Sequence, residues 1–112
     1  MEKNKIEVKP LLQSMLSASK EVLKKEWKHV APVAELQIKN IIHNLEQIAE
    51  LKLNKRITEE QAKLHLTIQK ESFKTILLSF EGIGIITAEK AINAALNTVK
   101  STINKAIGWR LL

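Results

Sequence analysis

Residues 77–96 read LLSFEGIGIITAEKAINAAL, the densest apolar stretch of the chain, interrupted by two glycines and a few polar side chains. On a helical reading, small side chains recur from here onward at steps of four and three, so they share one helix face. This small-residue seam comprises Gly84, Ala88, Ala91, Ala95, Thr98 and Thr102. Small side chains let two helix axes approach closely, so we expect the seam to be a helix-packing interface.

The two glycines leave the local conformation open. Gly82 and Gly84 would each weaken a helix interior by up to about 1 kcal/mol, yet they also permit close packing. Their neighbours Ile83 and Ile85 favour a buried position over an exposed loop. We therefore expect a continuous or locally distorted helix here, with a break near Thr87 as the alternative.

Composition points to an all-α protein of one domain. The chain has 112 residues, 45% of them hydrophobic, with only three glycines and two prolines. It has no cysteine, which excludes disulfides and thiolate chemistry and fits a reducing compartment. The first residues contain no apolar signal core, and no apolar run approaches the roughly 20 residues that span a bilayer. We expect a cytoplasmic protein.

The heptad-like apolar pattern predicts two long helical arms, at about residues 10–53 and 58–108, after a flexible lead of residues 1–9. Pro32 falls inside the first arm, where we expect a kink or two abutting segments rather than a reversal of direction. Thr58 and Gln61 form a T-x-x-Q capping box, which marks the start of the second arm.

Two arrangements satisfy these arms. Each arm would extend roughly 65 to 75 Å, and a lone hairpin of that length leaves its apolar flank in water. The hairpin could self-associate into a helical bundle, or the arms could fold back into a compact four-helix bundle within one chain. Because neither Pro32 nor the glycine pair is set in a polar loop, we predict the long antiparallel hairpin that forms a homo-oligomer.

No motif indicates catalysis, a cofactor or a metal. Glu26 and His29 form one E-x-x-H pair, but di-iron bundles use two such motifs with two further carboxylates. Neither the serine nucleophile elbow nor a phosphate-binding glycine loop occurs. We therefore expect a non-catalytic structural or protein-interaction module that self-assembles, with a protein partner not identified by the sequence.

Glu81 stands in the least polar part of the chain, between an aromatic residue and a glycine. A buried carboxylate needs a partner or a raised pKa. The residue could reach solvent, pair with a lysine, or be a partly buried group that fixes the register of assembly.

The C-terminal end carries only basic ionisable side chains after Glu89. It offers a membrane or anion contact formed by Lys100, Lys105, Trp109 and Arg110. An amphipathic basic end of this kind could lie on an anionic membrane surface, or its charges could simply complement a helix dipole. Nonspecific nucleic-acid binding is a further alternative with less support, because the chain has few aromatic residues for base stacking.

Overall fold

Four α-helices form within residues 6–112, the part of the chain that the computed structural model describes. They are α1 (Val8–Leu23), α2 (Trp27–Leu53), α3 (Glu59–Leu78) and α4 (Ile85–Ile107), and a short 3-10 helix, η1 (Lys24–Glu26), joins α1 to α2. No strand occurs among these residues. The prediction of an all-α protein is confirmed.

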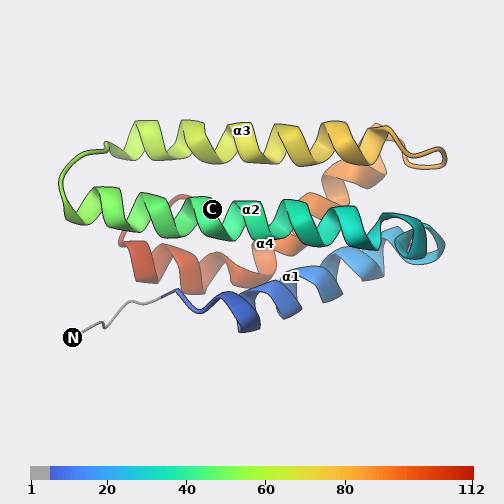
Figure 1. Cartoon of the computed structure of the whole chain (residues 1–112), viewed down its shortest axis with the longest axis horizontal. Coiled ribbons are helices and arrows are strands. Elements are labelled where there is room, and N and C mark those ends of the chain that lie inside the picture. Colours follow the sequence, from blue (N-terminus) through green and yellow to red (C-terminus); the bar gives the residue numbers. More distant parts are fainter. Residues whose placement is uncertain (1–5) are drawn as a thin grey trace.

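The helices run up and down around one core, as Figure 1 shows. Each helix packs against the next along the chain, and α1 packs most extensively against α4, which closes the bundle. The Cα atoms span 43 Å along the longest axis, well short of the predicted arms. Of the two arrangements, the chain therefore adopts the compact four-helix bundle, and the long hairpin does not form.

The first arm reverses direction at Lys24, not at Pro32. Lys24, the first residue of η1, has a φ of 49° and a ψ of −115°. Pro32 lies inside α2, which continues through it as one helix. Pro32 has no N–H to donate to the carbonyl of Lys28, so α2 continues without that one backbone hydrogen bond. The expectation that the chain does not reverse at Pro32 therefore holds, but the predicted first arm is wrong as a single unit, because the reversal comes at Lys24.

Replacing Lys24 by glycine is expected to raise the free energy of unfolding by about 0.5 to 1 kcal/mol. A positive φ strains a residue that has a Cβ, and this gain exceeds the greater freedom that glycine gives the unfolded chain. Urea denaturation of Lys24→Gly measures the difference. Lys25→Gly is the control, because Lys25 is not among the residues with positive φ. It should destabilise the protein, and a gain of stability in both variants would contradict the strain at Lys24.

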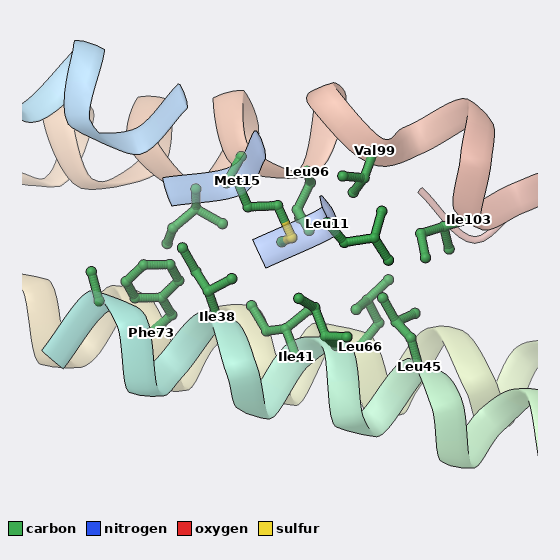
Figure 2. Close-up of a cluster of buried hydrophobic side chains, with 14 of the residues drawn as sticks. Leu11, Met15, Ile38, Ile41, Leu45, Leu66, Phe73, Leu96, Val99 and Ile103 are labelled. Carbon is green, nitrogen blue, oxygen red and sulfur yellow. The ribbon is translucent and has the colours of Figure 1, made fainter. Parts of the chain in front are cut away.

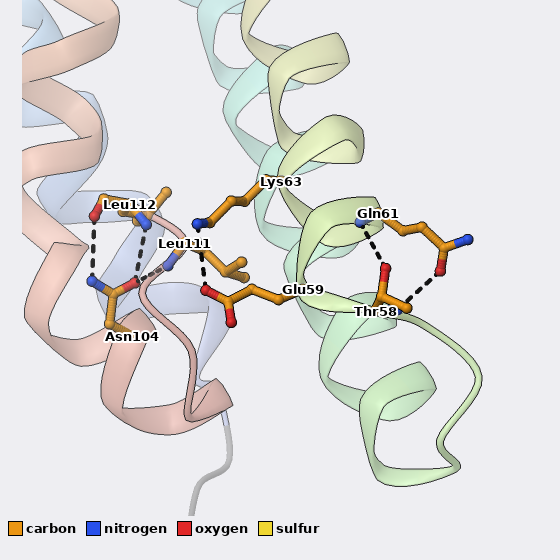
Figure 3. Close-up of polar contacts among 7 residues, drawn as sticks. All are labelled: Thr58, Glu59, Gln61, Lys63, Asn104, Leu111 and Leu112. Atoms are coloured by element: carbon orange, nitrogen blue, oxygen red, sulfur yellow. Dashed lines mark hydrogen bonds and ion pairs between the residues drawn. The ribbon is translucent and has the colours of Figure 1, made fainter.

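The turn between α2 and α3 follows the sequence prediction. The Thr58 hydroxyl accepts a hydrogen bond from the Gln61 amide at 3.1 Å, and the Thr58 amide donates to the Gln61 side-chain oxygen at 2.9 Å (Figure 3). The predicted capping box is confirmed. At the other boundary, α1 begins at Val8 and Ile6 is buried, so the predicted flexible lead extends too far; its residues 1–5 lie outside the described part.

The glycine pair ends a helix and starts another. α3 stops at Leu78 and α4 starts at Ile85, with Gly82 at a φ of +95° in the turn and Gly84 as the N-cap. The expected continuous helix is therefore wrong, and the break comes before Thr87. Of the isoleucines here, only Ile83 is buried. The Ile83 side chain therefore attaches this turn to the bundle, while the other isoleucines stay exposed.

Side chains from all four helices meet in the core (Figure 2). Phe73 of α3 and Met15 of α1 are fully buried, as is Ile41 of α2. The core residues labelled in Figure 2 are Leu11, Met15, Ile38, Ile41, Leu45, Leu66, Phe73, Leu96, Val99 and Ile103. The apolar stripes that predicted self-association are thus covered within the chain.

Candidate interaction surfaces

The middle of the small-residue seam lies inside the bundle. Ala88, Ala91 and Ala95 are at most 1% exposed. Ser19 of α1, also fully buried, donates a hydrogen bond from its hydroxyl to the Ala91 carbonyl at 3.2 Å. A side chain as short as serine reaches the α4 backbone only if the two helices approach closely, which alanine permits. This part of the seam therefore packs against α1.

The two ends of the seam are exposed. Gly84 precedes α4, while Thr98 and Thr102 lie on its surface. Thr98 borders a shallow groove whose other wall is the α1 face that carries Ser14 and Ser17. The only ionisable group in that wall is Glu21. The seam is therefore an interface at its centre and a solvent-facing surface at both ends.

Glu81 is exposed in the turn between α3 and α4, so the hypothesis of a partly buried carboxylate is wrong at this position. The carboxylate that meets this turn is Glu26, from the junction of η1 and α2. A Cβ added at Gly82 would come within 2.9 Å of a Glu26 carboxylate oxygen. The α1–α2 and α3–α4 turns therefore touch, and together they form one end of the bundle, which we call the turn end (Figure 1).

The basic C-terminal residues are split between solvent and the bundle. Lys100, Lys105 and Arg110 are exposed, whereas Trp109 is half-buried. The Nζ of Lys52, in α2, lies 4.8 Å from the centre of the Trp109 ring and donates to the carbonyl of Ile107 at 2.6 Å. This lysine therefore caps α4 and holds the indole against the protein, which leaves Trp109 poorly placed to enter a membrane.

Asn104 fixes the residues that follow α4. Its side-chain oxygen accepts hydrogen bonds from the amides of Leu111 at 2.9 Å and Leu112 at 3.0 Å (Figure 3). Gly108, with a φ of +87°, makes the turn that brings this segment back, and Leu111 is buried. Asn93 and Asn97 of the same helix are exposed, and nothing in the sequence distinguishes Asn104 from them.

The outer face of α3 carries two exposed apolar side chains that the sequence analysis did not single out. Leu64 is 60% exposed and Ile68 is 58% exposed. They are four residues apart and so adjoin on one face, opposite the face that buries Leu66 and Phe73. We call this pair the α3 outer face. The signal was present in the sequence as two large apolar residues outside the periodic stripe.

A second group of exposed apolar side chains lies at the turn end. Leu78 is 37% exposed, Ile85 57% and Ile86 70%. Four exposed lysines belong to the adjoining α1–α2 segment, namely Lys20, Lys24, Lys25 and Lys28. Among residues 6–112, none of these four makes an ion pair. Exposed apolar groups and free positive charges therefore occur together at this end.

One ion-pair network ties α3 to α4. Lys74 donates a hydrogen bond to a Glu89 carboxylate oxygen at 3.1 Å and lies 3.9 Å from Glu71. The hydrogen bond to Glu89, followed by the negative charge of Glu71, raises the pKa of Lys74 above its usual range. The lysine is therefore protonated at neutral pH, and the network serves helix pairing.

Among residues 6–112, no histidine belongs to a cluster of three ligand-type side chains. His43 Nδ1 lies 3.6 Å from Glu46 on the surface of α2. In the described part of the chain, no three His, Asp or Glu side chains gather closely enough to hold a metal ion. Nor does any helix between residues 6 and 112 combine the length and the apolar character needed to cross a membrane.

Comparison with known proteins gives no relative on which to base a function. No protein-family model, curated protein or solved structure matches this chain.

Proposed function

We propose that the chain is a non-catalytic helical interaction module that self-assembles through the α3 outer face. The observation that carries this proposal is the exposure of Leu64 and Ile68, at 60% and 58%, on one face of one helix. The long apolar stripes no longer motivate assembly, because the bundle covers them. Apart from Leu78 at the end of the helix, these are the large apolar side chains that remain exposed on α3, and burying them against a partner removes apolar area from water.

A second copy of the chain is the occupant that we propose for this face. In an antiparallel two-fold contact that sets Leu64 against Ile68 of the other copy, each copy presents the same pair to the other. The same register brings Glu60 beside Glu71 of the other copy on one flank of the contact, and Gln61 beside Ser72 on the other flank. The glutamate pairs repel each other, so the apolar pair alone favours this dimer.

The contact is small, so the dimer is expected to be weak. One helix pair buries less area than the standard protein interface, and small interfaces belong to transient complexes. We expect a dissociation constant on the order of 100 µM. The module is proposed to act in the cytoplasm, which the absence of cysteine supports.

Sedimentation equilibrium on the double variant Leu64→Gln/Ile68→Gln tests the proposal. The variant should raise the dimer dissociation constant about tenfold or more, since two glutamines replace the apolar contact. Leu36→Gln is the matched control, because Leu36 of α2 is 57% exposed but lies on another helix. It should dimerise like the original protein. A monomer at all concentrations, or equal weakening by both variants, would refute the α3 contact.

A further inference from the structure

We propose that the turn end binds the surface of an anionic membrane, with Ile85 and Ile86 inserted among the lipid headgroups. Lys24, Lys25 and Lys28 would then lie close to the lipid phosphates. This function goes beyond self-assembly and uses a different surface from the α3 outer face. It also differs from a contact made by the C-terminal end.

The apolar part of the turn end consists of two exposed side chains at the start of α4. Ile85 and Ile86 are consecutive residues in the first turn of α4, exposed by 57% and 70%. Gly84 before them has an extended backbone and nothing within 4 Å of the position its Cβ would take. Both turns lie at one end of the long axis of the bundle (Figure 1). The two isoleucines therefore stand at the start of the helix that leaves the turn end, where their side chains are open to an apolar partner.

Charge favours a lipid partner over an uncharged apolar one. The α1–α2 segment supplies four exposed lysines without ion pairs among the described residues, namely Lys20, Lys24, Lys25 and Lys28. Of the acidic groups at this end, Glu26 is half-buried near Gly82, while Glu21 and Glu81 remain exposed. Basic side chains that flank an apolar insertion are the combination that binds anionic lipid.

Aromatic side chains occur at both ends of the bundle. Trp27 at the start of α2 and Phe80 in the α3–α4 turn are half-buried and pack against the core. Trp109 at the opposite end is held by Lys52, and the exposed apolar group there is Leu53, a single side chain at the end of α2. Stable attachment to a membrane surface generally needs both an apolar and an electrostatic contribution. The turn end provides both.

Vesicle sedimentation tests this proposal with two kinds of vesicle. One is phosphatidylcholine alone, and the other contains about one third phosphatidylserine, which supplies the negative surface. The protein should bind the anionic vesicles more tightly, and added salt should weaken that binding because it screens the lysines. Ile85→Ser/Ile86→Ser should reduce the partition coefficient about tenfold or more. Leu36→Ser/Leu53→Ser is the apolar control, since both leucines are exposed away from the turn end; it should bind normally.

A charge-matched pair of variants locates the basic contact. Lys24→Gln/Lys25→Gln/Lys28→Gln should reduce binding to anionic vesicles about tenfold or more. Lys100→Gln/Lys105→Gln/Arg110→Gln removes the same charge from the other end and should have a much smaller effect. Circular dichroism verifies that each variant is folded, as expected for substitutions at exposed positions.

Three outcomes would overturn the proposal. Binding lost only in the C-terminal triple variant would assign the membrane contact to that end. Binding unaffected by the isoleucine and lysine variants of the turn end would exclude it as the contact. No binding to either kind of vesicle would favour a protein partner for the same surface. The variant Leu64→Gln/Ile68→Gln lacks the proposed dimer contact but keeps the turn end, so it should still bind vesicles. Loss of self-assembly can therefore be distinguished from loss of membrane binding.

Discussion

Phe73→Ala is expected to lower the free energy of unfolding by about 3 to 5 kcal/mol. Phe73 is fully buried in α3 and is one of the largest side chains in the core. The substitution removes its apolar area and leaves a cavity that the surrounding helices fill only in part. A domain of this size has about 5 to 15 kcal/mol of stability, so the loss is a large share of the total. Urea denaturation followed by circular dichroism should show a much lower midpoint.

Phe80→Ala is the matched control, because the chemistry of the substitution is the same and only the environment differs. Phe80 is half-buried in the turn after α3. Part of its ring is already in contact with water, so we expect less than half the loss caused by Phe73→Ala. Equal losses in the two variants would mean that Phe73 does not occupy a tightly packed core position.

Ala91→Leu is expected to lower the free energy of unfolding by about 1 to 3 kcal/mol. Ala91 is fully buried, and its carbonyl accepts the hydrogen bond from Ser19. Three added carbon atoms have no space where α1 and α4 approach, so the helices must separate or the leucine must adopt a strained rotamer. A thermal melt measures the loss. Because this contact lies within one chain, sedimentation should show no change in assembly.

Asn93→Leu provides the comparison for that variant on the same helix. Asn93 is exposed on the polar face of α4. Leucine forms helix well, so the change should stay within about 0.5 kcal/mol of the original stability. An unperturbed Ala91→Leu protein would show that the two helices have room to spare, contrary to the close approach inferred from Ser19.

The sequence predicted those parts of the fold that depend on neighbouring residues. The capping box at Thr58 requires only Gln61, three positions later, and it forms as expected. The reversal at Lys24 could not be predicted in this way, because lysine has no preference for a positive φ. There the packing of α1 against α4 imposes the turn and outweighs the local strain. Tertiary contacts also explain why Gly82 lies in a turn, where the sequence predicted a continuous helix.

The surfaces were harder to predict than the core. Periodicity identified Ala88, Ala91 and Ala95 as side chains that face another helix, but it could not say that the other helix belongs to the same chain. Periodicity also did not identify Leu64 and Ile68, because both residues lie outside the periodic apolar stripe. Exposure is a property of the whole arrangement of helices, so it requires the fold.

The pairing of α1 with α4 has a consequence for synthesis of the protein. Ser19 and its partner Ala91 are 72 positions apart, so a ribosome adding about 5 to 20 residues per second needs about 4 to 14 s to connect them. During that interval the apolar face of α1, with Leu11 and Met15, has no fourth helix to cover it. This apolar face of the nascent chain therefore stays uncovered until the last helix emerges from the exit tunnel.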